Sequence, residues 1–269
     1  MTDLIPIDPL FQVPFLTGLL IAGAVPLLGP LVRLRGEWLG ALSYSQAAAA
    51  GGVVGAVLGI PALALGVTTA ALTAALKAVL RREGNDFHGL VIIVGWMVMI
   101  LAMANSAHGR FVGEALIDGQ LYFADAQHLA GACAIALSLL VLSALLSRRL
   151  LSYSLFPGTA SANREPVRRH ALIFDIAVAV TLGMAASTMG IMAAFALALV
   201  PAWITFAFAS SWSQAVWLGV VLSVAAYVAA FTLALMLDQP FGPVFVAMLV
   251  LLLPLRLIGR LRPLSKPRP

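Results

Sequence analysis

Few residues of this chain could take part in catalysis or ligand binding. Histidine is the side chain most able to titrate or bind a metal near neutral pH, and four are present, at His88, His108, His128 and His170. All four lie close to the ends of predicted apolar segments, where a solvated, structural imidazole is the favoured interpretation. The chain has no GxxxxGK(S/T), HExxH or CxxC pattern. The sequence therefore predicts neither ATP binding by a phosphate loop nor a conventional zinc site within this chain.

Asp175 is the acidic residue of most interest, because it lies about one turn inside a predicted apolar span of residues 171–188. A carboxylate inside a membrane is unfavourable and usually faces protein or water. Asp175 is therefore a candidate for the lining of a transport path. The alternative, which we favour on the residues alone, is that it pairs with His170 or Arg169 at the inner membrane interface.

The composition indicates that membrane helices position these residues. Of the 269 residues, 62% are hydrophobic and only 10% are charged, and the mean hydropathy is +1.02. Soluble domains carry about 25% charged residues, so the chain is predicted to be an all-α, polytopic membrane protein. The one cysteine, Cys133, excludes an intrachain disulfide and is expected to be a small packed residue. The net charge of +5 comes from short basic clusters at helix ends, which indicates membrane topology rather than nucleic-acid binding.

Nine apolar segments are predicted to cross a hydrocarbon layer of about 30 Å. They cover residues 10–32, 47–59, 62–80, 88–106, 126–147, 171–188, 190–208, 215–237 and 243–258. Residues 36–46 are predicted to be a linker and residues 108–125 a polar loop. With the N-terminus outside and the C-terminus inside, Arg110 is the only one of the 16 Lys and Arg residues on the outer side. Because basic residues concentrate on the cytoplasmic side, this bias supports the count and the orientation of a single transmembrane domain, 1–269.

The stretch Met189–Thr205, MGIMAAFALALVPAWIT, is predicted to be an interior membrane helix. Gly190 stands near one end of it and Pro201 near the other. A proline removes one backbone hydrogen bond, and in hydrocarbon the freed carbonyl needs another partner. The pattern fits either a broken helix beside a packed or water-filled path or an ordinary proline-kinked span.

Small residues are concentrated in the second predicted span. Gly51, Gly55 and Gly59 form two overlapping GxxxG pairs. Because small residues let helix backbones approach closely in lipid, the pairs predict tight packing, either within one subunit or between two copies.

Four stretches carry a pattern that extends over nearly the whole chain. They are LLGPLVRLRGEWLGALSYSQAAAAGGVVGAVLGIP, FPGTASANREPVRR, MGIMAAFALALVPAWIT and LDQPFGPVFV, in this order. The first resembles the first cytoplasmic turn and second helix, and the second the cytoplasmic coupling segment, of the permease subunits of metal-ion ABC importers, the zinc and manganese uptake class. The third and fourth resemble that family's VGVLLVxALLVLPAATA and LDLPTGPxIV.

This resemblance implies a multi-pass permease subunit in a bacterial cytoplasmic (inner) membrane that takes up a divalent metal ion, zinc or manganese. Besides the lipid bilayer it implies a second permease copy, two ATPase subunits and an extracytoplasmic metal-binding protein, and no nucleic acid. ATP is then hydrolysed by the partner subunits, so the chain itself is not expected to be an enzyme or to hold a cofactor. Alternating access would move the metal between the two permease copies.

The coupling segment, about residues 150–170, is implied to dock on the ATPase through Phe156, Arg164, Arg168 and Arg169. It lacks the acidic pair and the glycine of the family pattern. By physics alone it is the longest cytoplasmic interval, and a solvated positive-inside loop would explain the same arginines.

The second helix departs from the family where the metal-contacting pair is expected. The family carries D-A-L-S-H-A, whereas residues 40–47 read Gly-Ala-Leu-Ser-Tyr-Ser-Gln-Ala. Tyr44 takes the histidine position if ALSY is aligned with ALSH, and Gln46 takes it if SQA is aligned with SHA. Both are neutral oxygen donors and poor substitutes for imidazole or carboxylate. The metal ligands are therefore unknown, and Tyr44, Gln46 and Asp175 are the candidates for the transport path.

Several functions are compatible with these departures. A transport path needs binding loose enough for release, so the loss of strong ligands does not exclude metal uptake, which is the first hypothesis. Another small cargo, such as a metal chelate, is the alternative. A secondary transporter would be expected to show internal repeats and buried titratable groups, which the sequence does not suggest. A structural membrane subunit is a further alternative.

Overall fold

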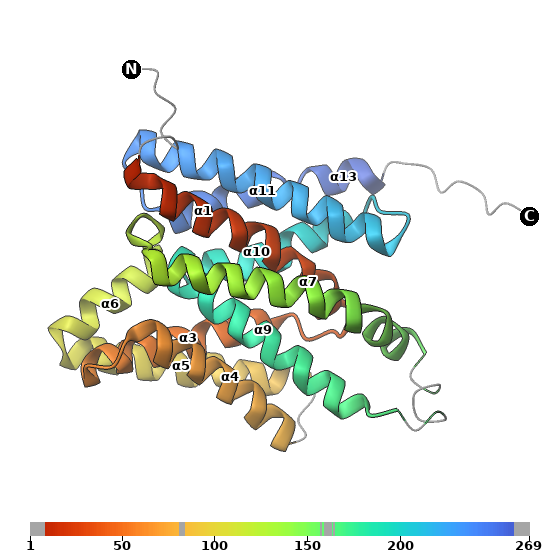
Figure 1. The fold of residues 1–269 in the computed structure, drawn as a ribbon, viewed down its shortest axis with the longest axis horizontal. Helices are drawn as coiled ribbons and strands as arrows, with labels where there is room; N and C mark the ends of the chain where they lie inside the picture. The colour runs from red at the N-terminus through yellow and green to blue at the C-terminus, as the bar shows by residue number, and fades with distance from the viewer. Residues whose placement is uncertain (1–8, 81–83, 157, 159–162, 164, 261–269) are drawn as a thin grey trace, which may run out of the picture.

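Helices make up all of the secondary structure in the part of the chain that the computed structural model describes, residues 9–80, 84–156, 158, 163 and 165–260. The α-helices are α1 (Pro9–Ala24), α2 (Gly29–Leu34), α3 (Leu39–Leu58), α4 (Ala62–Leu80), α5 (Asn85–Asn105), α6 (Ala107–Asp118), α7 (Ala126–Leu155), α9 (Val167–Met189), α10 (Ile191–Thr205), α11 (Trp212–Leu237), α12 (Phe241–Leu251) and α13 (Leu255–Arg260). Short 3-10 helices, η2 (Val25–Leu27) and η3 (Leu121–Phe123), connect some of them. The long helices run back and forth along one direction (Figure 1). The predicted all-α class is confirmed.

Seven helical segments among the described residues are long and apolar enough to cross a membrane. They are Pro9–Leu34, Leu39–Leu58, Ala62–Leu80, Asn85–Asn105, Ala126–Leu155, Val167–Met189 and Trp212–Leu237. The spans expected at 190–208 and 243–258 instead form the shorter apolar helices Ile191–Thr205 and Phe241–Leu257. The second of these is interrupted before Pro254, because proline lacks the N–H that a continuous helix requires. The chain is therefore a multi-pass membrane protein whose spans differ in length.

Two intervals that were expected to be irregular are helical. Helix α3 begins at Leu39, so most of the expected linker 36–46 lies within it. The expected polar loop 108–125 is largely helix α6, which begins after Ser106. The Ser106 side chain accepts a hydrogen bond from the backbone N–H of Gly109 at 3.1 Å and so caps this helix. A polar composition predicted a loop, but capping and one packed face are sufficient for a short amphipathic helix.

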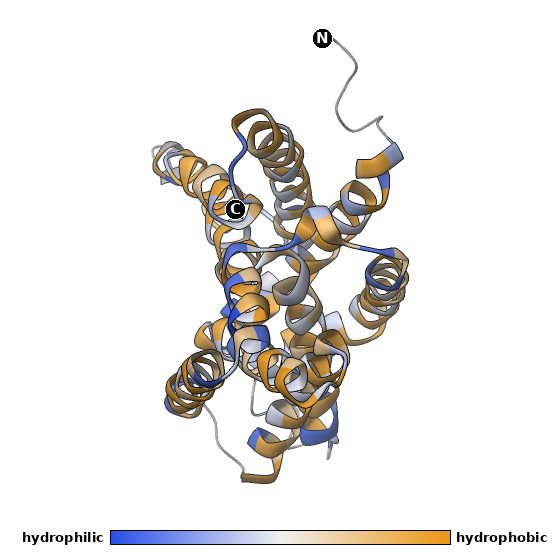
Figure 2. Cartoon of the chain, turned by 90° about the vertical axis from the view of Figure 1, so that its left-hand side faces the viewer, coloured by the Kyte–Doolittle hydropathy of each residue, from blue (hydrophilic) through white to orange (hydrophobic). Residues whose placement is uncertain are grey.

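Helices α3, α9 and α10, together with the α1–α2 segment Pro9–Leu34, form the interior of the bundle. In the most apolar 18-residue stretch of each span, 78% of the residues of α3 and 67% of those of α9 are buried, against 11% of those of α7. Most residues of α10 are buried as well. Helices α5, α7 and α11 expose large apolar side chains, and Figure 2 shows that hydrophobic residues make up much of the length of the helices. This distribution is that of a bundle whose outer helices face lipid.

The glycines of α3 allow close packing within one subunit. A Cβ atom at Gly51 would lie 2.3 Å from Thr69 Oγ1 on α4. In the same contact, a Cβ atom at Gly66 would lie 2.7 Å from the carbonyl oxygen of Ala48. Of the two explanations for the GxxxG pairs, packing within the monomer therefore accounts for Gly51.

Gly190 separates α9 from α10. Its φ of 94° and ψ of 156° lie in a region that favours glycine, and a Cβ atom there would lie 2.9 Å from the carbonyl oxygen of Ile117. Pro201 lies inside α10, which continues to Thr205. The interruption of this stretch is thus located at Gly190.

Candidate functional site

The two candidate path residues of α3 are buried and carry unpaired polar atoms. Tyr44 is 2% exposed and Gln46 is fully buried. Within the described part of the chain, the Tyr44 hydroxyl and both amide atoms of Gln46 have no hydrogen-bond partner. A buried polar group without a partner costs roughly 1–3 kcal/mol, so such groups in the most buried span call for a functional explanation.

Tyr44 and Asp175 lie together, but Gln46 lies apart from them. Tyr44 and Asp175 line one small cavity of about 10 Å³, which is closed on its other sides by residues including Glu37 and His88. Gln46 instead packs against α5, where a Cβ atom at Gly95 would lie 2.7 Å from its Cγ. The structure therefore brings two of the three predicted path residues together.

Asp175 belongs to a buried group of four charged residues, Arg35, Glu37, Lys77 and Asp175, which we call the charge ring. Lys77 Nζ lies 2.7 Å from Glu37 Oε2 and 3.1 Å from Asp175 Oδ2. Arg35 lies 3.1 Å from Glu37 Oε2 and 2.9 Å from Asp175 Oδ1. Each cation contacts both carboxylates, so the ring is closed and its formal charge is balanced. It joins the α2–α3 connection to α4 and α9.

The predicted pairing of Asp175 with His170 or Arg169 is wrong. Asp175 lies about two turns inside α9, which begins at Val167. Residues five or six positions apart do not share a helix face, whereas those three or four apart do. His170 instead contacts the Tyr153 hydroxyl at 2.9 Å and the Arg149 guanidinium at 3.3 Å, both on α7.

The surroundings of Glu37 favour its charged form. Burial acts to raise the pKa of Glu37, but the charge of Arg35 and the hydrogen bond and charge of Lys77 outweigh it, so the pKa is lowered. The Arg35 guanidinium lies over the Phe174 ring, 5.3 Å from its centroid. The ring is thus a set of buried ions held by one another, in which removal of one member leaves another uncompensated.

His88 is a buried neighbour of Tyr44. It is 1% exposed, and its ring contacts the Tyr44 ring edge-on at a centroid distance of 5.3 Å. Its Nδ1 lies 2.7 Å from Ser43 Oγ, and its Nε2 has no hydrogen-bond partner among the described residues.

The segment predicted to couple to the ATPase borders the same cavity as the charge ring. Phe156 ends α7 and is exposed, while Arg168 and Arg169 are exposed in the first turn of α9. Arg164 lies outside the described residues. Arg168 lines a cavity of about 590 Å³ together with all four residues of the charge ring. The start of α9 and the charge ring therefore border the same cavity.

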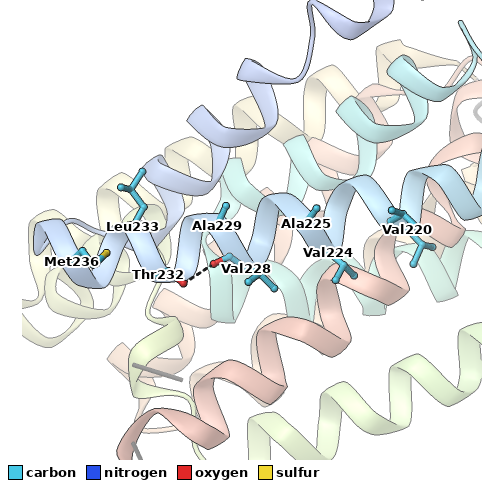
Figure 3. Close-up of a pocket in the computed structure, with 9 residues that line it drawn as sticks. Val220, Val224, Ala225, Val228, Ala229, Thr232, Leu233 and Met236 are labelled. Carbon is cyan, nitrogen blue, oxygen red and sulfur yellow. Dashed lines mark hydrogen bonds between the residues drawn. The ribbon is translucent and has the colours of Figure 1, made fainter. Parts of the chain in front are cut away.

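A third, larger cavity has no side chain that could act as an acid, a base or a metal ligand. It is an open groove of about 900 Å³ along α11, lined by Val220, Val221, Val224, Ala225, Val228, Ala229, Thr232, Leu233 and Met236 (Figure 3). Its one hydroxyl, on Thr232, donates to the backbone oxygen of Val228 at 3.0 Å. The groove is an apolar helix face and holds no titratable group.

The sequence pattern of the ABC 3 transport family matches residues 8–259. The chain belongs to this family. Its members are membrane permease subunits rather than enzymes, and ATPase activity belongs to a separate subunit. Membership therefore implies ATPase and substrate-binding partners, as the resemblance of the four stretches predicted.

Solved structures share the fold of this permease. One is PsaBC from Streptococcus pneumoniae in complex with Fab, with a TM-score of 0.79 and 17% identity over 95% of this chain and 92% of that one. Another is an inward-facing conformation of a protein assigned to the metal-chelate type of ABC transporter, with a TM-score of 0.67 and 15% identity over 95% of this chain and 91% of that one. No curated protein sequence matches the chain. Likeness at these identities concerns the fold alone.

His88 is the residue of this permease that sequence reasoning missed. It was expected to be solvated at a span end, but α5 begins at Asn85, so His88 lies one turn inside the helix. The Asn85 side chain holds this turn against the α2–α3 connection, because it donates to the Gly36 carbonyl at 3.0 Å. No local pattern predicts the contact with Ser43, which is 45 residues away in sequence.

Proposed function

We propose that the chain is the permease of an ABC importer that takes up a divalent metal ion, zinc or manganese. The observation that carries the proposal is the pair of unpartnered polar side chains, Tyr44 and Gln46, on the most buried span of an ABC 3 family member. Residues 1–269 form one transmembrane domain that works as a homodimer in a bacterial cytoplasmic membrane. Two ATPase subunits and an extracytoplasmic metal-binding protein complete the importer.

The weak donors suit transport rather than storage. Among the described residues, no group of three or more His, Cys, Asp or Glu side chains could hold a metal ion. A conducting site must release its ion, so a hydroxyl and an amide on the path are compatible with passage. The same observation favours a second candidate cargo, a metal chelate, whose own ligands would satisfy the metal. The fold likeness to a protein assigned to the metal-chelate type adds to this candidate.

Elemental analysis of cells with and without the gene distinguishes the two cargoes. Cells are starved of metal and given zinc or manganese either as the free salt or bound to a membrane-impermeant chelator. Uptake of the free salt that depends on the gene supports the metal ion, and gene-dependent uptake of the chelated form alone supports the chelate. Equal metal content in both strains under all conditions contradicts both.

The charge ring provides the inner gate of the proposed path. It joins three elements at the end of the bundle from which the coupling segment leaves, and it borders the cavity beside Tyr44. While the ring is closed, α9 is held against α4 and the α2–α3 connection. Movement of the start of α9 by the ATPase opens the ring and exposes the path to the cytoplasm, as alternating access requires.

We also propose nine crossings with the N-terminus outside. The first turn of α1 and helix α13 lie at opposite ends of the bundle in Figure 1, as an odd number of crossings requires. Basic side chains gather at the α13 end: Arg33 lies over Phe206 at 5.6 Å and Arg256 over Trp203 at 4.3 Å. This bias supports a cytoplasmic position for that end.

Cysteine labelling in intact cells tests the orientation. In a Cys133→Ser background, Phe123→Cys should react with an impermeant thiol reagent, because Phe123 is 83% exposed in the predicted outer connection. Ser161→Cys, in the coupling segment, should react only after the cells are opened. Gly119 is unsuitable as the outer site, since its φ is +86° and a Cβ atom would lie 2.3 Å from the Met189 carbonyl oxygen. Labelling of Ser161→Cys in intact cells would contradict the proposed orientation.

A further inference from the structure

The hydrogen bonds around His88 define which of its nitrogens carries the proton. The Ser43 hydroxyl donates to the backbone carbonyl of Gly40 at 3.0 Å. Its oxygen is then the acceptor for His88 Nδ1, which lies 2.7 Å away. From these two contacts we assign the proton to Nδ1 and the free lone pair to Nε2. A second hydrogen bond that fixes the tautomer in this way is characteristic of histidines that bind metals.

His88 lines a small cavity beside α3. A Cβ atom at Gly40 would lie 3.2 Å from Nε2 and 3.3 Å from Cε1, so the imidazole packs closely against α3 and requires a small residue at this position. Gly40, Tyr44 and His88 line the same cavity of about 10 Å³. Such a volume accommodates roughly one water-sized particle. The unpaired Tyr44 hydroxyl lies on this cavity as well.

The neighbouring charges do not exclude a cation. Arg35 and Lys77 are balanced by Glu37 and Asp175 in the charge ring, so the cavity borders a group with no net formal charge. Helix α3 lacks the strong ligands of the family pattern, and the imidazole of His88 on α5 offsets this loss.

We propose that His88 Nε2 is a contact for the metal ion during its passage, with the Tyr44 hydroxyl as a second, weaker donor. This inference rests on the proposed function and names the residue that selects among metals. Imidazole favours borderline transition metals such as zinc over manganese, which prefers oxygen ligands. With few strong donors nearby, the contact is transient, as conduction requires.

The test is His88→Asn, which keeps an amide near the Nδ1 position for Ser43 and removes the Nε2 donor. Zinc uptake by cells carrying the complete importer should fall about 10- to 100-fold at matched membrane level, the range typical for disturbed metal sites. Manganese uptake should fall less, so the zinc-to-manganese ratio should drop. His108→Asn is the matched control, because His108 is exposed on α6 and should leave both rates unchanged. Purified full-length permease in lipid nanodiscs should also bind Co²⁺ with an imidazole-type absorption band that His88→Asn removes.

Failure of this inference is distinguishable from failure of the proposed function. If the native importer takes up metal and His88→Asn keeps the native zinc-to-manganese ratio, His88 is only a packing residue and the inference is overturned. If the native importer takes up no free metal, the proposed function fails and the inference with it. If His88→Asn does not reach the membrane, Ser43→Ala is the alternative test. It keeps the imidazole but removes the hydrogen-bond partner of Nδ1, so that either nitrogen can carry the proton. It should lower the same ratio, and an unchanged ratio overturns the proposal.

Discussion

Replacement of Lys77 by methionine is expected to lower the free energy of unfolding of this permease by about 3 kcal/mol. Lys77 is 3% exposed and is the cation shared by Glu37 and Asp175 at 2.7 and 3.1 Å. Methionine preserves the apolar stem of the side chain and removes only the charge, which leaves the two buried carboxylates with one cation. The value is at the lower end of the range for a broken buried pair, because Arg35 still contacts both carboxylates. The thermal midpoint of the purified permease should fall by roughly 6–12 °C.

Two further variants separate charge balance from packing. Lys77→Met combined with Glu37→Gln leaves one cation and one carboxylate, so it should recover part of the lost stability. Arg110→Met, an exposed position on α6, should change the stability by less than about 0.5 kcal/mol. A Lys77→Met protein as stable as Arg110→Met, or a double variant less stable than Lys77→Met alone, would contradict the balanced ring.

The partners within this ring illustrate what the sequence cannot predict. Arg35 and Asp175 are separated by 140 residues, and their contact depends on how α9 is rotated against the α2–α3 connection. Hydropathy predicts that a segment is a membrane helix, but the direction in which one side chain points depends on packing against several neighbours at once. The rule that residues three or four apart share a face would have excluded His170 as a partner of Asp175. The identity of the true partners still requires the structure.

The presence of the helices was easier to predict from the sequence than the residues at which they begin and end. Every predicted apolar segment is largely helical in the described residues, although 10–32 and 243–258 are each divided between two α-helices. Hydropathy succeeds here because burial in lipid depends on composition over a long stretch. The start of α3 at Leu39 and the whole of α6 were missed, since capping by Ser106 and a single packed face do not raise the mean hydropathy. A three-residue error at the start of α5 concealed His88, which a helix beginning at Asn85 buries.

Charge reversal in the coupling segment, Arg164→Glu with Arg168→Glu, is expected to abolish uptake and the stimulation of the ATPase subunits by the permease. Arg168 stands in the first turn of α9 and lines the cavity that borders the charge ring. Asp175 lies seven residues further along the same helix, about 10 Å along its axis. A rigid helix of this kind transmits a displacement of its exposed start to the ring. If the ATPase no longer binds that start, the ring stays closed and the path stays shut.

Measurements of membrane level and stability, together with control variants, distinguish a loss of coupling from a loss of folded protein. Exposed substitutions usually cost less than about 0.5 kcal/mol, so the double variant should reach the membrane at the native level and unfold within a few degrees of the native protein. Arg110→Glu on α6 reverses an exposed charge away from the segment and should leave uptake unchanged. The neutral pair Arg164→Gln with Arg168→Gln should retain part of the activity if docking depends on shape as well as charge. Uptake and ATPase stimulation at native levels in the double glutamate variant would mean that the arginines only orient the chain in the membrane, in which case the ring would have to be opened from another element.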